Sequence, residues 1–283
     1  MKKELRKIVA ILNSQPTMEG AGVRLQRVFG FHDLPRLDPF LLLDHFGSEN
    51  PADYLAGFPW HPHRGIETVT YMHQGLVEHG DSLGNRGVIA SGDVQWMTAG
   101  SGIIHQEMPK AWPGPMRGFQ LWVNLPAASK MMGPRYREIK KEQVVGFSPA
   151  AGVQVKIIAG KIGNRQGPVK DLVVPIEYLD VVLQANAVFR HSFPDGWKVF
   201  AYVYEGQGIF TAAESVSAGQ AVVFGPGAEV EISAREQGLS LLLVSGRPLA
   251  EPVAWGGPIV MNTQEELETA FNEYRSGTFI KNP

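Results

Sequence analysis

Two short pairs of residues have the types and the spacing of metal ligands. His61 and His63 stand two residues apart, and so do His105 and Glu107 further along the chain. On a β-strand, residues two apart point to the same face and lie about 7 Å apart. If two such strands lie side by side, three imidazoles and one carboxylate converge on one point. This set of nitrogen and oxygen ligands indicates a transition-metal site.

The segments beside these pairs must be strands if they are to position the ligands in this way. Residues 67–72 are rich in β-branched and aromatic side chains, and residues 94–98 follow a Ser-Gly-Asp turn. Many short strands separated by glycine and proline turns indicate an all-β barrel or sandwich. Further strands are expected at residues 8–12, 22–29, 40–46 and 119–125.

The composition excludes several classes of protein. The 283 residues carry a formal net charge of −2, so the chain has no excess of positive charge with which to bind nucleic acid or an anionic membrane. The chain has no cysteine, so a bound metal must be held by nitrogen and oxygen. The apolar run at residues 8–12 is too short for a signal peptide or a membrane helix. We therefore expect a cytoplasmic protein that does not enter a membrane.

The second half of the chain weakly repeats sequence patterns of the first half. Residues 71–75 (Tyr-Met-His-Gln-Gly) match residues 202–206 (Tyr-Val-Tyr-Glu-Gly), and a pair of glycines eight residues apart recurs at a slightly shorter offset. A weak repeat of this kind indicates two copies of one fold. These offsets map the four ligand positions to side chains that bind metal poorly, namely Ser192, Pro194, Ile232 and Ala234.

The second copy is therefore expected to form a metal-free barrel that supports the first. His191 is the one histidine near the mapped positions, and we interpret it as a structural or surface residue. The tail predicts a helix, because Thr263 and Glu266 have capping-box spacing and Gly277 follows the apolar stripe that starts at Leu267. Arg64 and the lysines at 140–141 are interpreted as solvated charges.

Several consecutive motifs resemble the pirin family. They run from His61 to Tyr71, from Gly92 to Gly100 and from His105 to Pro109, with shorter matches at residues 120–126 and 134–136. The resemblance covers about residues 20 to 137 and is looser in the second half. It implies two jelly-roll cupin barrels with iron in the first. The expected domains are an N-terminal metal-binding cupin (1–130), a linker (131–148) and a C-terminal metal-free cupin with the terminal helix (149–283).

Two carboxylates compete to complete the metal site. His61-x-His63-x3-Glu67 fits the general cupin motif, in which Glu67 is the fourth ligand, whereas the pirin pattern takes Glu107. Both glutamates are in phase with a histidine, so periodicity does not separate them. The resemblance favours Glu107. Glu67 is then expected either to lie behind the ligands, where it would hold an imidazole or Arg64, or to be a carboxylate of the core.

The resemblance also implies an activity, because pirin-like proteins include quercetin 2,3-dioxygenases. A flavonol would bind the metal through its 3-hydroxyl, Glu107 or a neighbouring base would take the proton, and O2 would open the ring with release of carbon monoxide. Fe(II) is the expected metal, with Mn, Ni, Co, Cu and Zn as alternatives. Four apolar side chains are expected either to line the substrate pocket or to belong to the barrel core: Phe58, Trp60, Trp96 and Met108.

Two other functions fit the same residues. Some pirins are iron-dependent regulators that bind a protein partner, and a cupin of this kind could also act on an unrelated small metabolite. Turnover of quercetin with consumption of O2 would separate the dioxygenase from both.

Overall fold

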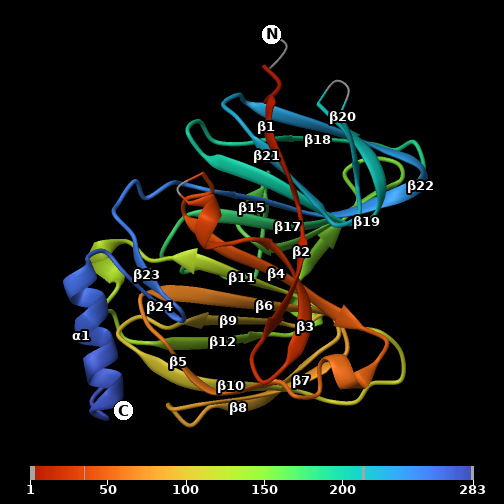
Figure 1. The fold of residues 1–283 in the computed structure, drawn as a ribbon. Helices are drawn as coiled ribbons and strands as arrows, with labels where there is room; N and C mark the ends of the chain where they lie inside the picture. Colours follow the sequence, from red (N-terminus) through yellow and green to blue (C-terminus); the bar gives the residue numbers. More distant parts are fainter. Residues whose placement is uncertain (1–3, 35, 212–213, 282–283) are drawn as a thin grey trace. The chain divides into compact units, whose positions relative to one another are not determined.

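The computed structural model describes residues 4–34, 36–211 and 214–281 (Figure 1). The fold is mostly β-structure, as predicted. It divides into two compact units. Unit 1 consists of Met1–Gln15, Asp33–Pro39 and Glu142–Pro248, and unit 2 consists of Pro16–His32, Phe40–Lys141 and Leu249–Pro283.

These units interleave along the chain, which differs from the expected division into consecutive domains. The first strand, β1 (Ile8–Asn13), pairs with β21 (Gln220–Phe224) and belongs to unit 1. The last segment, residues 249–283, belongs to unit 2 and not to the second barrel. Each barrel is therefore completed by a chain end that lies far away in the sequence, and local patterns do not reveal such a pairing.

The span expected to be a linker, residues 131–148, also contains regular structure. It holds β12 (Arg135–Ile139), the 3-10 turn η4 (Lys141–Gln143) and β13 (Val145–Phe147). Both strands lie at the edge of a sheet. Charged side chains are common on edge strands, where they discourage pairing with other chains. This explains why the segment has the composition of a linker.

Unit 2 consists mainly of two antiparallel sheets. The larger has seven strands in the order β12-β9-β6-β11-β4-β3-β2, and the smaller has the order β5-β10-β7-β8. The strands of the larger sheet besides β12 are β2 (Gln15–Glu19), β3 (Val23–Phe29), β4 (Phe40–Ser48), β6 (Ile66–Gln74), β9 (Val94–Thr98) and β11 (Met116–Asn124). The strands of the smaller sheet are β5 (Phe58–His63), β7 (Leu76–Asp81), β8 (Arg86–Ala90) and β10 (Ile103–Pro109).

The C-terminal segment of unit 2 contains a hairpin and the one α-helix among the described residues. The hairpin is β23 (Ala254–Gly256) with β24 (Ile259–Met261), and the helix is α1 (Gln264–Arg275). The predicted capping box is confirmed, since Thr263 Oγ1 accepts from Glu266 N at 3.2 Å and Glu266 Oε2 accepts from Thr263 N at 3.1 Å. No helix in the described part of the chain is long and apolar enough to span a membrane. The remaining 3-10 turns are η1 (Phe31–Asp33), η2 (Pro51–Asp53) and η3 (Ala127–Ser129).

Unit 1 is built around a nine-stranded sheet. Its main path is β1-β21-β19-β22-β17-β14-β13, while β18 pairs with β22 and β20 with β19. Its core is formed by aliphatic and aromatic side chains of alternate positions, such as Ile157, Leu179 and Leu241. The strands not yet given are β14 (Val153–Ala159), β15 (Lys161–Ile162), β16 (Arg165–Gln166), β17 (Ile176–Leu183), β18 (Val188–Ser192), β19 (Lys198–Phe210), β20 (Glu214–Ser217) and β22 (Glu229–Gly246).

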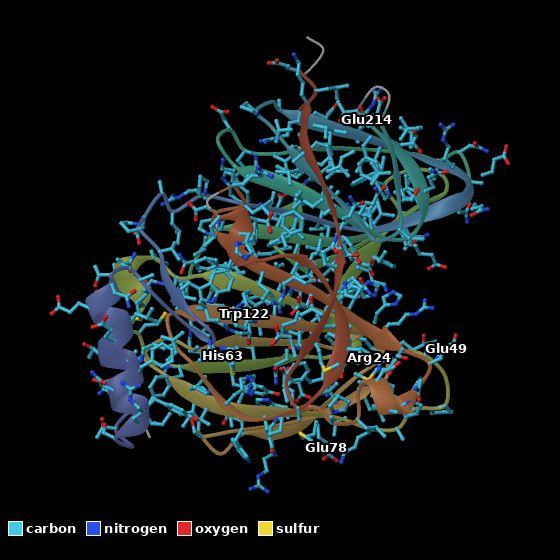
Figure 2. The ribbon with its side chains drawn as sticks, viewed as in Figure 1. Arg24, Glu49, His63, Glu78, Trp122 and Glu214 are labelled. Carbon is cyan, nitrogen blue, oxygen red and sulfur yellow. The ribbon has the colours of Figure 1, made fainter. Side chains whose placement is uncertain are left out.

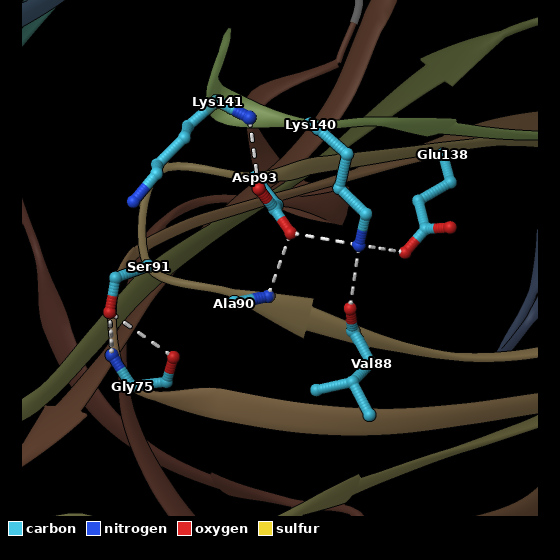
Figure 3. A network of polar contacts seen from close by, with 8 residues as sticks. All are labelled: Gly75, Val88, Ala90, Ser91, Asp93, Glu138, Lys140 and Lys141. Atoms are coloured by element: carbon cyan, nitrogen blue, oxygen red, sulfur yellow. Dashed lines mark hydrogen bonds and ion pairs between the residues drawn. The ribbon is translucent and has the colours of Figure 1, made fainter.

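A polar network holds the turn before β9 and includes Lys140, whose side chain is 44% exposed, as expected of a solvated charge, and also ion-paired (Figure 3). Asp93 Oδ2 accepts from Ala90 N at 3.1 Å, and its Oδ1 accepts from the backbone of Lys141 at 2.9 Å. Lys140 Nζ donates to the same carboxylate at 3.1 Å and to the carbonyl of Val88 at 3.1 Å. This lysine therefore ties the end of β12 to the β8–β9 turn.

Candidate metal centre

The two predicted ligand pairs lie on neighbouring strands. β5 and β10 are antiparallel partners, and His61 is directly opposite His105. One ring nitrogen from each of His61, His63 and His105 lies within 4.8 Å of the other two. The rings of His61 and His105 are 4.4 Å apart between centroids. The structure thus brings together three of the four predicted ligands.

Backbone carbonyls fix which nitrogen of two imidazoles faces the centre. His61 Nδ1 is 2.8 Å from the carbonyl oxygen of Pro59, and His63 Nδ1 is 3.1 Å from that of Pro258. A carbonyl only accepts, so each Nδ1 carries the proton and each neutral ring has a bare Nε2. These two Nε2 atoms face each other at 3.1 Å. Two lone pairs at this distance repel each other unless a proton or a metal ion is bound there.

This spacing fits a shared metal ion. Two nitrogens bound at about 2.1 Å and at right angles to each other are about 3 Å apart. His105 supports the same interpretation, since it is fully buried and neither ring nitrogen has a hydrogen-bond partner among the described residues. Burial lowers its pKa well below the ordinary value, and burial lowers the pKa of His63 to about 3. Neutral, unpaired imidazoles are what metal binding requires.

Glu107 lies on the same strand as His105 and lines the cavity beside the histidines. A bulge in the β5–β10 pairing falls between His105 and Glu107. Thr70 Oγ1 donates to Glu107 Oε1 at 2.8 Å, and Gln120 Nε2 donates more weakly to Oε2 at 3.4 Å. The carboxylate is not within the 4.8 Å group formed by the three imidazoles. Its role as fourth ligand therefore stays a prediction.

Glu67 points away from this cavity. Side chains alternate along β6, so Glu67 lies on the face opposite to Thr70, which contacts Glu107. Glu67 Oε1 accepts from Thr98 Oγ1 at 2.6 Å. Burial raises the pKa of the Glu67 carboxyl group, while Thr98, Trp96 and two arginines act to lower it. Of the two expected alternatives, Glu67 is the buried core carboxylate, and it accepts from Thr98 instead of holding an imidazole or Arg64.

Arg64 is buried, so its interpretation as a solvated charge is wrong. Its side chain is 2% exposed, and Nη1 donates to Glu273 Oε2 at 2.7 Å. Nη2 donates to the carbonyl of Phe279 at 2.8 Å, and the guanidinium lies 4.2 Å from the centroid of the same residue's ring. All three partners belong to the C-terminal segment, more than 200 positions away, which is why the sequence around Arg64 does not show them.

A cavity of about 670 Å³ opens beside the histidines. Its wall includes His61, His63 and Glu107, and Trp122 packs edge-on against His63 with ring centroids 5.0 Å apart (Figure 2). The volume is typical of a small-molecule site. Of the four apolar side chains named from the sequence, Phe58 and Trp60 line the cavity, whereas Trp96 and Met108 do not.

Alternation explains this split. Trp96 is fully buried and is the cross-strand partner of Val69, one position from Thr70, so it lies on the face of the sheet away from the cavity. Met108 follows Glu107 and so points to the other side of β10. Met108 is thus on the wrong face although it is next to Glu107, whereas Trp60, next to His61, lines the cavity.

A further histidine, His79, lies next to His105 and was not among the predicted site residues. Their ring centroids are 5.8 Å apart, and the His79 ring stacks on Tyr136 at 4.6 Å with an interplanar angle of 8°. His79 Nε2 lies 3.4 Å from Asp81 Oδ2, and both side chains are fully buried. The spacing of two between His79 and Asp81 could have indicated that both lie on one face of a strand. The register then places them on the ligands' face, since His79 is opposite Glu107 and Asp81 is opposite His105.

Unit 1 contains a strand pair that corresponds to β5 and β10. The glycine pair at residues 92 and 100 recurs at residues 219 and 227, an offset of 127 residues. The same offset takes Ile103 of β10 to Val230 of β22. The cross-strand partner of Ile103 is His63, and that of Val230 is His191. His191 therefore has the place in unit 1 that His63 has in unit 2.

The mapping of the first ligand pair to Ser192 and Pro194 was three residues too far along. Residues 64–65 connect β5 to β6, whereas residues 193–197 connect β18 to the corresponding β19. This longer connection displaced the alignment. By register, the remaining equivalents are Phe189, Ile232 and Ala234, none of which has a metal-binding atom in its side chain. His191 Nε2 contacts Glu177 Oε2 at 3.0 Å.

Two β-barrel units, one of them with converging imidazoles beside a cavity, define the chain as a two-domain cupin protein with a candidate metal centre. The family model for Pirin matches residues 22–123, and that for the Pirin C-terminal cupin domain matches residues 178–280. The chain belongs to the pirin family.

Relatives match over nearly the whole chain. A Pseudomonas aeruginosa protein named "Putative quercetin 2,3-dioxygenase" is 46% identical over 96% of this chain and 97% of its own length. A pirin-like protein of Caulobacter vibrioides is 45% identical over 97% of this chain and 99% of its own. The crystal structure of a quercetin 2,3-dioxygenase from Acinetobacter baumannii is 32% identical and superposes with a TM-score of 0.91, covering 97% of this chain and 98% of that one.

Proposed function

We propose that this protein is a metal-dependent dioxygenase of the quercetin 2,3-dioxygenase type, with Fe(II) held by His61, His63, His105 and Glu107. The observation that carries the proposal is the pair of imidazole Nε2 atoms 3.1 Å apart beside a 670 Å³ cavity. A site that binds metal only for stability does not need such a cavity next to the ligands. The names of the relatives support the same class of reaction.

When bound, a divalent metal with open coordination positions would acidify a coordinated hydroxyl and take part in the activation of O2. The reaction consumes one flavonol and one O2 and gives one ring-opened ester and one carbon monoxide. Both oxygen atoms of O2 remain in these products, and no further oxidant or reductant is required.

The residues of the chain have separate tasks in this reaction. The carbonyls of Pro59 and Pro258 hold the two imidazoles with Nε2 toward the centre. Glu107 Oε1 lies 2.8 Å from Thr70 Oγ1, whose single proton is shared between this carboxylate and Gln120 Oε1 at 2.5 Å, whereas Oε2 has only the long contact of 3.4 Å with Gln120. Oε2 is therefore the atom with the greater capacity to accept the proton of the 3-hydroxyl.

The aromatic walls of the cavity suit a planar substrate. Phe58, Trp60, Trp122 and Trp255 line it, and the rings of Trp122 and Trp255 lie 6.0 Å apart between centroids. Rings of this kind stack on a flavonol and keep bulk water from the reacting carbon atoms. A small hydrophilic metabolite would leave these surfaces uncovered.

The test is turnover by the iron-loaded protein. With quercetin in air, we expect O2 uptake and carbon monoxide release in equal amounts, and His63→Ala should abolish both. His191→Ala, at the corresponding place in unit 1, is the matched control and should retain activity. If the loaded wild type consumed no O2 with quercetin beyond the rate of the metal-free protein, the proposal would be wrong.

A further inference from the structure

A row of polar side chains crosses the larger sheet of unit 2. Arg27, Asp44, Gln120 and Thr70 are successive cross-strand partners on β3, β4, β11 and β6. All four line the cavity beside the candidate metal centre. The row therefore begins at Thr70, which contacts Glu107, and ends at Arg27 on the far side of the cavity.

The far end of the row is a charged cluster. Arg27 binds Asp44 in a bidentate manner, with Nε to Oδ1 at 2.9 Å and Nη2 to Oδ2 at 2.8 Å. Its Nη1 lies 2.9 Å from Glu19 Oε1. Two carboxylates around one guanidinium leave this cluster with a net negative charge. Each Asp44 oxygen accepts one hydrogen bond here, so lone pairs remain for another donor.

The fold itself does not require this cluster. The cavity-lining neighbours of Asp44 two positions away on β4 are Leu42 and Phe46, and Leu25 is the corresponding neighbour of Arg27. Asp44 is only 5% exposed, so its carboxylate has lost most of its hydration. Apolar residues in place of a buried ion pair are often as stable or more stable. The charges at this end of the row, flanked by Leu42, Phe46 and Leu25, therefore indicate recognition of a ligand.

The dimensions of the row match an extended aromatic molecule. Neighbouring strands are about 4.8 Å apart, so Asp44 lies about 10 Å, two strand spacings, from Thr70. A planar phenol with two or three rings that is anchored at the metal reaches this distance. An anionic group at the far end would meet Asp44 and Glu19, whereas a neutral hydroxyl could donate to Asp44.

We propose that Asp44, held in place by Arg27, recognises a hydroxyl at the end of the substrate that lies away from the metal. The cavity then selects planar polyphenols with a neutral hydroxyl donor at that end over phenols that lack it. This proposal rests on the proposed flavonol-binding function, and it assigns a specificity-determining role to residues that do not contact the metal ligands.

Binding without turnover tests this role. Metal-loaded protein is titrated under anaerobic conditions with quercetin and with 3-hydroxyflavone, which has the same metal-binding atoms but no other hydroxyl. The change in flavonol absorbance on binding gives both Kd values. Asp44→Leu should weaken quercetin binding roughly tenfold, the usual effect of losing a hydrogen bond to a charged group. The Kd for 3-hydroxyflavone should change by less than about twofold.

Two further variants keep the test decisive. Asp44→Asn preserves the side-chain volume and should also reduce the preference for quercetin, in case the leucine variant folds poorly. Asp53→Asn is the matched control, because Asp53 forms a partly exposed ion pair with Arg24 at 3.6 Å and does not line this cavity. Metal content measured for each variant shows whether the centre is intact.

The outcomes separate this inference from the proposed function. If quercetin and 3-hydroxyflavone lose affinity equally, or if the preference is unchanged in both Asp44 variants, the inference is overturned. It is also overturned if the metal-loaded wild type binds neither flavonol. Selective loss of quercetin binding without any turnover by the wild type would support the inference and contradict the dioxygenase proposal.

Discussion

His63 donates from Nδ1 to the carbonyl oxygen of Pro258, which lies 195 residues later in the chain, at 3.1 Å. This bond aims Nε2 of His63 at the candidate metal centre. The carbonyl belongs to residues 249–283, which complete unit 2. The C-terminal segment therefore contributes to the orientation of a predicted ligand although it supplies none itself.

A chain that ends at Pro248 should consequently bind metal poorly. It keeps His61, His63, His105 and Glu107 but loses the acceptor for His63. Loss of a group that orients a metal ligand typically weakens metal binding by 10- to 100-fold. Titration with Fe(II) under anaerobic conditions gives the affinity. If the shortened chain bound Fe(II) as tightly as the full-length protein, the segment would not be needed to orient the site.

Arg64→Met should destabilise the protein strongly. The change leaves the carbonyl of Phe279 without its donor and removes the buried partner of Glu273, which keeps only Lys281 at 2.8 Å. Breaking a buried ion pair costs about 3 kcal/mol. Lys110→Met is the control, because its ion pair with Glu78 is about half exposed and should contribute less than about 1 kcal/mol. Urea unfolding of the metal-free proteins measures both. Equal effects would contradict the structural role of Arg64.

The two carboxylates near the ligands should behave differently. Glu107→Gln removes a predicted anionic ligand and the candidate base, so metal affinity and any oxygenase activity should fall. Glu67→Gln changes a carboxylate on the opposite face of β6 and should leave metal affinity within about threefold of the wild type. Parallel titrations with Fe(II) compare the two variants. A larger loss from Glu67→Gln would mean that the protein follows the general cupin motif.

The metal-free protein should lose stability as the pH falls below about 6.5. Burial, Arg117 and His73 lower the pKa of His45 to about 4, and burial lowers that of His63 to about 3. Both titrate near 6.5 in the unfolded chain, so between about pH 4 and 6.5 the unfolded state binds more protons. The free energy of unfolding then decreases with falling pH by at most about 1.4 kcal/mol per unit for each histidine.

Denaturant unfolding between about pH 4.5 and 6.5 measures this slope. His45→Asn should reduce it by one histidine's share, because asparagine does not titrate. His45 lies on β4 at the position after Asp44, so it points away from the cavity. A slope that is the same in the variant and the wild type would contradict the assignment of the effect to His45.

Much of the fold could be predicted from local patterns. The period of two placed His61 and His63 on one face, and the Thr263–Glu266 spacing gave the start of α1. What could not be predicted depends on contacts between distant parts of the chain. The burial of Arg64 depends on residues near 273 and 279, and the pairing of β1 with β21 depends on more than 200 intervening residues.

The candidate site shows the same limit. The phase of Glu67 relative to His63 could not be counted through the turn at residues 64–65, because alternation ends where a strand ends. The place of His191 was hidden by a connection that is longer in unit 1 than in unit 2. Strand register, which the sequence does not specify directly, decides both questions.

The central claim is that the three imidazoles of unit 2 hold one metal ion, and metal content tests it most directly. The protein is loaded with Fe(II) under anaerobic conditions, passed through a desalting column and analysed for iron, alongside His63→Ala and His191→Ala. The account predicts about one iron per chain in the wild type and in His191→Ala, and almost none in His63→Ala. A wild type that retains no iron, or a His63→Ala variant that retains as much as the wild type, would contradict it.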